Sequence, residues 1–116
     1  MSGRRGLEIE QRGEHGELRL LLIGELDIAV APRLQEAVAR ACEQERARAL
    51  TIDLSRLVFI DSSGMAAIVY ASRFCERHEC ELSLVPAQPP VQRVFELTGL
   101  DALLPFGADA DGRALA

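Results

Sequence analysis

The apolar and polar residues near the start of the chain alternate in a way that predicts a β-hairpin. Leu7 and Ile9 are separated by charged residues, and a period of two is typical of a half-exposed strand. Residues 13–16 (Gly-Glu-His-Gly) have the composition of a turn, and residues 17–23 alternate at first and then become continuously apolar. We therefore expect two antiparallel strands, of which the second lies deeper in the sheet.

Three later segments have the spacing of helices with one apolar face. The first runs from about residue 31 to about residue 46. The second begins near Ser62 or Ser63 and ends near Glu79, and the third lies between the prolines at 89–90 and a C-terminal cap at Gly99. Their apolar positions are Leu34, Val38, Ala41 and Cys42 in the first helix, Met65, Ile68, Val69, Ser72 and Cys75 in the second, and Val91, Val94, Phe95 and Leu97 in the third.

Strand-like segments at 49–54 and 81–85 separate these helices. The order β-β-α-β-α-β-α predicts one α/β domain, with a mixed, mostly parallel sheet of about four to five strands packed with helices. We place this domain at residues 7–106, and within it we expect a last short packed element that contains the apolar residues Leu100, Leu103, Leu104 and Phe106. Residues 1–6 are expected to form a flexible arm and residues 107–116 a frayed tail.

The most informative stretch joins the middle of the chain to the second helix. The apolar segment 57–60 (Leu-Val-Phe-Ile) is expected to be buried, and it leads directly into Asp61-Ser62-Ser63-Gly64. Asp and Ser are typical of helix starts, because their side-chain oxygens accept hydrogen bonds from the N–H groups of the first turn. An exposed hydroxyl there is also easily reached by another enzyme. A phosphate on it would be favoured by the helix dipole, and its charge would block a partner that prefers a neutral surface.

Composition and charge narrow the range of functions. Apolar residues make up 48% of the chain and charged residues 27%, as in ordinary globular domains. The formal net charge of −5 and the 4% aromatic content argue against binding to nucleic acid, which requires basic surfaces and stacking rings. All 13 basic residues are Arg, so Schiff-base and Lys-nucleophile chemistry is excluded.

The expected location is the cytoplasm. The first residues carry charges without an apolar segment behind them, and no apolar run, residues 20–23 included, approaches the 18 or so residues of a membrane span. We therefore expect no membrane insertion. Three cysteines, an odd number, indicate reduced thiols instead of a disulfide framework.

One cysteine cluster has metal-like spacing, Cys75-x2-His78-x-Cys80. A structural zinc site needs four ligands, and the remaining candidates, Cys42 and His15, are far away in the sequence. Cys75 also belongs to the apolar stripe of the second helix, which explains it as a small core residue. From the sequence we expect neither a metal nor another cofactor.

No catalytic machinery is evident, and we expect the protein not to be an enzyme. A nucleophilic Ser62 or Ser63 would need an adjacent base, and nothing places His15 or His78 beside them. The Gly-x-Ser-x-Gly motif and the Gly-rich loop that ends in Lys-Ser/Thr are both absent. A receiver-type phosphoacceptor at Asp61 is a weaker alternative, because it would need an acidic cluster for Mg²⁺ and a cationic partner.

Three blocks resemble one family, the STAS domains, and within it the bacterial anti-sigma factor antagonists. They are Gly24-Glu25-Leu26-Asp27, then Asp53-Leu54 through Phe59-Ile60-Asp61-Ser62-Ser63-Gly64, and finally Val94-Phe95-Glu96-Leu97-Thr98-Gly99-Leu100. They follow the family's order and spacing, and the resemblance covers about residues 7–106. One departure is Met65-Ala66, where the family often has Leu-Gly. Met is close in volume to Leu, so the packing should be preserved.

The resemblance implies a partner switch that regulates sigma-factor-dependent transcription. Ser62 would be phosphorylated by an anti-sigma factor that is also a serine/threonine kinase, and a serine phosphatase would reset it. The unphosphorylated protein would bind the kinase, and the phosphorylated protein would release it. Asp27 would face the kinase, and the neighbourhood of the phosphosite would include Asp61, Ser63, Gly64 and Met65. We expect Ser62 both to cap the second helix and to be the phosphorylated residue.

Two other functions stay open at this stage. A STAS module can serve as a structural subunit without phosphorylation, for example beside a lipid transporter or in a stress-sensing assembly. A small α/β domain of this kind could also bind a small ligand. The sequence leaves the oligomeric state open between a monomer and a weak dimer.

Overall fold

The computed structural model describes residues 6–107, so most of the predicted N-terminal arm (1–6) and C-terminal tail (107–116) lies outside the described residues. The described chain folds in the predicted order. The elements are β1 (Leu7–Glu14), β2 (Glu17–Leu26), α1 (Ala31–Glu43), β3 (Ala49–Ile60), α2 (Ser62–Arg77), β4 (Glu81–Val85), α3 (Pro89–Thr98) and the short 3-10 helix η1 (Leu100–Ala102).

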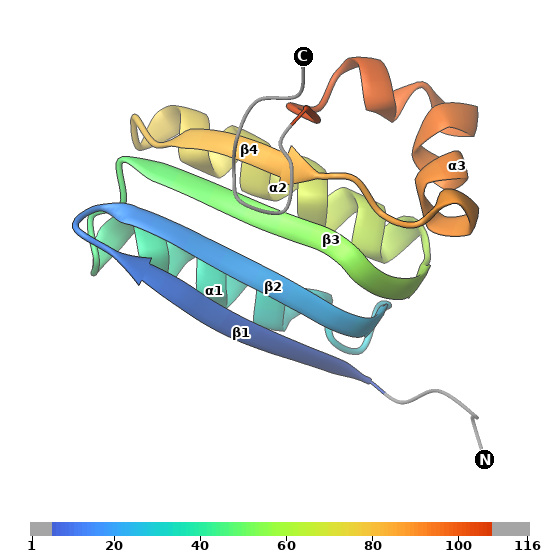
Figure 1. Cartoon of the computed structure of the whole chain (residues 1–116), viewed down its shortest axis with the longest axis horizontal. Helices are drawn as coiled ribbons and strands as arrows, with labels where there is room; N and C mark the ends of the chain where they lie inside the picture. Colours follow the sequence, from blue (N-terminus) through green and yellow to red (C-terminus); the bar gives the residue numbers. More distant parts are fainter. Residues whose placement is uncertain (1–5, 108–116) are drawn as a thin grey trace.

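The sheet has four strands in the spatial order β1-β2-β3-β4 (Figure 1). β1 and β2 form the predicted antiparallel hairpin, whereas β2–β3 and β3–β4 are parallel pairs. The prediction of a mixed, mostly parallel sheet is therefore confirmed. Two irregularities in the register of β2 against β3 fall after Leu21 and Gly24. They bend the strands toward their carboxyl ends, where both lead into turns that precede helices.

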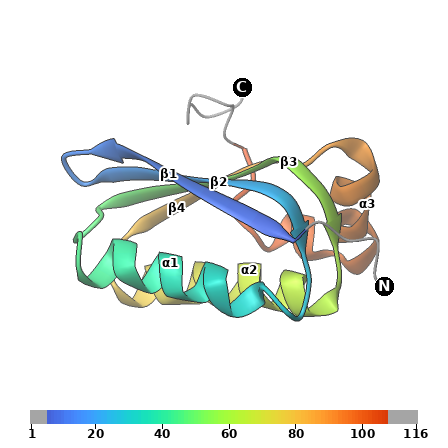
Figure 2. The same cartoon turned by 90° about the horizontal axis from the view of Figure 1, so that it is seen from below.

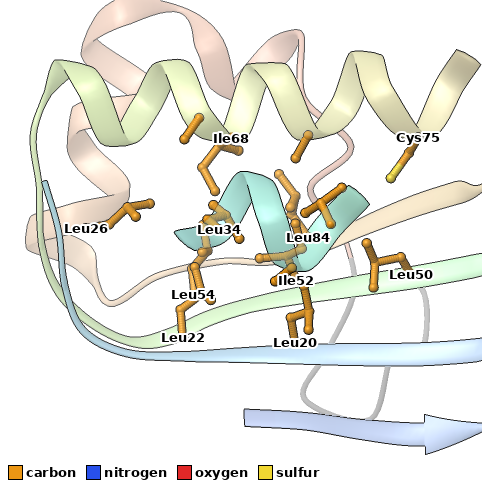
Figure 3. Packing of buried hydrophobic residues seen from close by; sticks show 14 of the residues in the cluster. Leu20, Leu22, Leu26, Leu34, Leu50, Ile52, Leu54, Ile68, Cys75 and Leu84 are labelled. Atoms are coloured by element: carbon orange, nitrogen blue, oxygen red, sulfur yellow. The ribbon is translucent and has the colours of Figure 1, made fainter. Parts of the chain in front are cut away.

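Both long helices cover the same face of the sheet. α1 and α2 lie side by side below the strands in Figure 2, and neither of them lies on the opposite face of the sheet. Alternate residues of each strand point toward the helices, so an aliphatic core forms between the two layers (Figure 3). Fully buried members of this core include Leu20, Leu22, Leu34, Ile52, Leu54, Ile68 and Leu84.

The third helix lies at the end of the sheet where β3 terminates (Figure 1). Its buried residue Phe95 makes an edge-to-face contact with Phe106, with a ring-centroid distance of 5.2 Å. Gly99 ends the helix with a φ of 77°, the left-handed conformation expected of a C-terminal cap. The chain then returns along β4, where Leu84 N donates to Pro105 O at 2.9 Å and Leu84 pairs with Phe106. These residues cover part of the β4 edge.

The structure corrects several boundaries and burials. Segment 57–60 is not uniformly buried, because it is the bulged second half of β3 and leaves Val58 69% exposed. Leu97 and Leu103, expected to pack, are 74% and 79% exposed. The first two helices also end earlier than predicted, at Glu43 and Arg77. In both cases the chain turns away through a residue with positive φ, Arg46 at 52° and Glu79 at 55°.

A charged pair lies on the sheet face that α1 and α2 do not cover. Asp53 of β3 is only 4% exposed, and its Oδ2 accepts a hydrogen bond from Nη2 of Arg19 on β2 at 3.1 Å. Its other oxygen, Oδ1, accepts a hydrogen bond from the N–H of Ser55 at 2.9 Å. Since a buried carboxylate is tolerated only when it is paired and hydrogen-bonded, these contacts explain an acidic residue in a central strand. Within residues 6–107, no helix has the length and apolar character needed to cross a membrane.

Candidate functional site

The candidate site forms where two neighbouring parallel strands end. Leu26 and Ile60 are paired at the carboxyl ends of β2 and β3, so the turns that follow these strands lie side by side. The first turn leads into α1 and contains Asp27. The second leads into α2 and contains Asp61 and Ser62. The carboxyl end of a parallel sheet is a common location for functional residues, because successive turns meet there.

Asp61 holds the two turns together. Its extended backbone (φ −112°) is that of an N-cap, and its Oδ1 accepts a hydrogen bond from Gly64 N at 2.9 Å. Its Oδ2 accepts one from Ile28 N at 3.3 Å, and its own N–H donates to Leu26 O at 3.3 Å. The capping group is therefore Asp61 and not Ser62, which corrects the expectation that capping and phosphorylation meet at one residue. The Ser62 hydroxyl is not needed to cap the helix.

Gly64 allows the first turn of α2 to lie directly on β2. A Cβ atom at this position would collide with the carbonyl oxygen of Leu26, and it would lie 2.8 Å from Ile60 Cγ1 and 3.0 Å from Leu26 Cγ. Any side chain would therefore push the start of the helix away from the strand. Glycine here is required by close packing and not by a left-handed backbone.

Asp27 shapes the other turn. Its Oδ1 accepts hydrogen bonds from Ala29 N at 3.0 Å and from Val30 N at 3.3 Å. Its carbonyl oxygen accepts further bonds from Val30 N and Ala31 N, at 3.2 and 2.9 Å. The N-cap of α1 is Val30, which has no capping side chain, so Asp27 satisfies N–H groups at the start of this helix. The residue that the resemblance assigns to the kinase side thus also has a local structural role.

Ser62 is exposed and Ser63 is half-buried. The first-turn N–H groups of Gly64 and Met65 donate to Asp61, whereas those of Ser62 and Ser63 have no acceptor within residues 6–107. Such groups at a helix start can bind an anion. Among the residues predicted for partner binding, Gly64 and Met65 are buried, so any part they have in binding is indirect; their roles and that of Ser62 stay predictions.

The sequence did not indicate that Ile28 belongs to the site. Its side chain is 72% exposed, yet its N–H is bonded to Asp61, so an apolar residue lies on the surface next to the Ser62 turn. Exposed isoleucines are common, and the sequence offers no sign that this one stays outside the core. Its position directly after Asp27, in a turn between strand and helix, is the only signal available.

Neither His15 nor His78 lies beside Ser62 and Ser63. His78 is the C-cap of α2, whose 16 residues separate it from Ser62 by about 24 Å at about 1.5 Å per residue. Its ring stacks on Phe74 at a centroid distance of 4.1 Å, and its Nδ1 is 2.9 Å from Phe74 O. His15 lies in the β1–β2 turn, and the neighbouring Gly16 accepts a hydrogen bond from Ala49 at the start of β3. Both histidines therefore lie at the end of the domain opposite to Ser62.

The family model of the STAS domain matches residues 7–111. Because this match spans most of the chain, the protein belongs to the STAS domain family. The matched segment includes both turns of the site and all four strands. A search among curated proteins gives no match.

Solved structures extend the comparison. An anti-sigma factor antagonist from Mycobacterium paratuberculosis is 28% identical, with a TM-score of 0.77 over 91% of this chain and 89% of that chain. The Bacillus cell fate determinant SpoIIAA in its phosphorylated form is 22% identical, with a TM-score of 0.67 over 91% and 95%. A sulfate transporter family protein from Wolinella succinogenes is 19% identical, with a TM-score of 0.69 over 83% and 80%. The last two likenesses establish the fold alone.

Proposed function

We propose that this protein is an anti-sigma factor antagonist whose activity is switched by phosphorylation of Ser62. The observation that carries the proposal is an exposed serine hydroxyl at the start of a helix, in a turn that Asp61 and Gly64 hold in place. The family membership and the likeness to the Mycobacterium antagonist support this function. SpoIIAA, which shares this fold, has been solved in a phosphorylated form, and we propose a phosphate as the switch here as well.

In this proposal the unphosphorylated protein binds an anti-sigma factor that is also a serine/threonine kinase, and so frees the sigma factor for transcription. The binding surface is formed by the turns after β2 and β3. Ile28 supplies an exposed apolar contact, and Asp27, Asp61 and Ser63 belong to the same two connections between strand and helix as Ser62. Apolar side chains that become buried at the centre of an interface contribute much of its affinity.

Phosphorylation ends the binding by local charge. A phosphate on Ser62 adds a charge of about −1.5 to −2 to a surface that already carries Asp61 one residue away. The free N–H groups of Ser62 and Ser63 stabilise that phosphate on the antagonist itself. The kinase surface, which was complementary to a neutral hydroxyl, then has to accept an unmatched charge. No large rearrangement of the antagonist is required.

The chain acts as substrate and not as catalyst in this proposal. The kinase supplies ATP, Mg²⁺ and the catalytic base, and this chain supplies the hydroxyl that attacks the γ-phosphoryl group. The hydroxyl proton passes to the kinase base, and ADP leaves. A serine phosphatase later hydrolyses the phosphoserine and restores binding. This cycle takes place in the cytoplasm, where sigma factors act.

Mapping the phosphosite tests the assignment. The protein is incubated with candidate anti-sigma factor kinases of its host and ATP, and the product is digested and analysed by mass spectrometry. We expect one phosphate on Ser62, its loss in Ser62→Ala, and unchanged labelling in Ser63→Ala, which serves as the matched control. Labelling at Ser63 or elsewhere would contradict the assignment of Ser62.

Calorimetry then tests the switch on the kinase that performs this labelling. Ser62→Ala should bind with the affinity of the unmodified protein. Ser62→Asp should bind at least about tenfold more weakly, which corresponds to about 1.4 kcal/mol. Equal affinities would rule out charge as the switch. If no host kinase binds or labels the chain, while it purifies from its host within a transporter or stress-sensing assembly, the structural-subunit alternative is favoured.

A further inference from the structure

Three cysteines converge at the end of the domain opposite to the phosphorylation turn. Cys42 lies near the end of α1, Cys75 near the end of α2, and Cys80 directly before β4. All three side chains are buried, and their sulfur atoms lie within 4.8 Å of one another. The Sγ atoms of Cys42 and Cys75 are 3.8 Å apart. Figure 3 shows Cys75 pointing from α2 toward the sheet, into the space between the two layers.

The spacing of the sulfur atoms fits one metal ion. Metal–sulfur bonds of about 2.3 Å place two sulfur ligands of the same ion about 3.8 to 4.0 Å apart. The distance between Cys42 and Cys75 already has this value, and the third sulfur is close enough to reach it by a small side-chain rotation. Three small apolar residues would fill the same space without a need for sulfur. The convergence of three thiols from two helices and the turn before β4 is therefore what distinguishes this cluster from ordinary packing.

The number of donors decides which ion fits. A structural zinc site needs a fourth ligand, and the fold brings in Cys42 as a third ligand only. His78 is not a fourth, because it stacks on Phe74 with its Nδ1 at Phe74 O. The cluster of donor atoms found within residues 6–107 contains these three sulfurs alone. Zinc in structural sites is four-coordinate, whereas thiolates alone suit soft ions such as Cu(I).

The geometry points to a three-thiolate site for a soft monovalent metal ion of the Cu(I) class, formed by Cys42, Cys75 and Cys80. On binding, three S–Cu bonds form, and the three thiol protons pass to the solvent. Neither the metal nor the sulfur changes its oxidation state. A cavity of about 480 Å³ beside Cys42 gives the ion a path to the cluster. Arg46 and Arg48 line that cavity and partly offset the negative charge of the loaded site, against Glu43 and Glu79 on the same lining.

Burial affects two of the three thiols in the absence of an ion. Burial raises the pKa of Cys80 to about 11, and burial together with the nearby Cys42 raises the pKa of Cys75 well above its usual range. A buried thiol with a raised pKa is a poor nucleophile, so Cys75 and Cys80 do not have the features of reactive cysteines. A cation that replaces the protons instead joins α1, α2 and the start of β4 at one point.

Competition with a chromophoric Cu(I) chelator tests the site. The full-length protein, reduced and kept under anaerobic conditions with three titratable thiols, is titrated against the Cu(I) complex of bathocuproine disulfonate. We expect transfer of one Cu(I) per chain. Cys75→Ala should lower the affinity at least about a hundredfold, since losing even a supporting residue of a metal site can cost that much. His78→Ala is the matched control, and it should leave both stoichiometry and affinity unchanged.

A second readout separates loss of the site from loss of the fold. Cu(I) should raise the melting temperature of the unaltered protein, because a ligand that binds only the folded state stabilises it, and it should not raise that of Cys75→Ala. Should Cys75→Ala fail to fold, Cys80→Ala at the end of the α2–β4 turn takes its place. The inference is overturned if the protein takes no Cu(I) from the chelator, if Cu(I) uptake persists in the cysteine variant, or if Zn²⁺ binds more tightly than Cu(I).

Discussion

Asp53 within β3 and Asp61 directly after it make similar hydrogen bonds in two different surroundings. Each accepts a bond from a backbone N–H that follows it, Ser55 N for Asp53 and Gly64 N for Asp61, both at 2.9 Å. Each also accepts one from the β2 side of the molecule. For Asp53 that donor is the guanidinium of Arg19, whereas for Asp61 it is only the backbone N–H of Ile28. The difference lies in the charge of the partner.

That difference separates a structural carboxylate from one whose charge remains at the surface. Asp53 is buried, and Arg19 neutralises it, so its charge is not available outside the sheet. Asp61 forms no ion pair within residues 6–107, and it is half-exposed at the turn that carries Ser62. A partner that approaches Ser62 therefore meets this negative charge. The same residue type fixes backbone geometry in both places, but only at the end of the strand can it influence recognition.

The largest expected effect comes from adding a methyl group at Gly64, where α2 packs closely against β2 beside Asp61. Gly64→Ala places a methyl group against Leu26 O and Ile60 Cγ1, so α2 has to shift away from β2 and the hydrogen bonds of Asp61 to Gly64 and Ile28 lengthen. We expect a loss of about 3 kcal/mol in the free energy of unfolding, the upper range for overpacking. Urea denaturation followed by circular dichroism measures it.

Gly99→Ala is the matched control for this variant. Gly99 has a φ of 77°, and apart from Gly99 and its two chain neighbours no atom of residues 6–107 lies within 4 Å of the place that an added methyl group would take. Its substitution therefore costs only the left-handed backbone, about 1 kcal/mol. If the two variants lose the same stability, steric contact with β2 is not what requires glycine at 64. The turn would then tolerate side chains at that position, and Asp61 alone would hold it.

The next largest effect concerns the ion pair between Arg19 and Asp53 in the centre of the sheet. Arg19→Met keeps much of the packing of the side chain but leaves Asp53 buried without its cation. We expect a loss of about 2 kcal/mol in the free energy of unfolding, less than for a fully buried pair because the Arg19 side chain is 25% exposed. Arg12→Met removes the cation from the more exposed Arg12–Glu10 pair and should cost much less stability, because solvent screens an exposed ion pair. Equal losses would show that the burial of Asp53 does not matter.

The sequence was sufficient for the arrangement of the fold, because each element carried a local signal. Alternation marked the hairpin, apolar stripes marked the helices, and Gly99 marked the end of α3. The apolar residues Val58 and Phe59 predict a buried segment where the structure has the second half of β3. Its bulges depend on how β2 and β3 curve against each other, which no local pattern encodes.

The site was predictable only in part, for the same reason. The composition of Asp61-Ser62-Ser63-Gly64 indicated a helix start, but two serines and an aspartate offered three possible capping groups. Which of them caps depends on the position of β2, since Leu26 and Ile28 fix Asp61 from outside its own segment. The cluster of Cys42 with Cys75 and Cys80 is likewise a product of helix packing, because the residues come from α1, α2 and the turn before β4.

The smallest expected effect comes from comparing Asp61, which caps α2, with Ser62, the proposed site of modification. Asp61→Ala removes the cap of α2 and the link to Ile28, and we expect a loss of about 1.5 kcal/mol in the free energy of unfolding. Ser62→Ala removes an exposed hydroxyl without a capping role, so its change should stay within about 0.5 kcal/mol. Denaturation of both variants in parallel measures the difference. A loss at Ser62 as large as that at Asp61 would mean that the hydroxyl supports the turn, and a phosphate there would then disturb the fold as well as the binding surface. A small loss at Ser62 leaves its hydroxyl available for modification at almost no cost to stability, as a switch that acts by local charge requires.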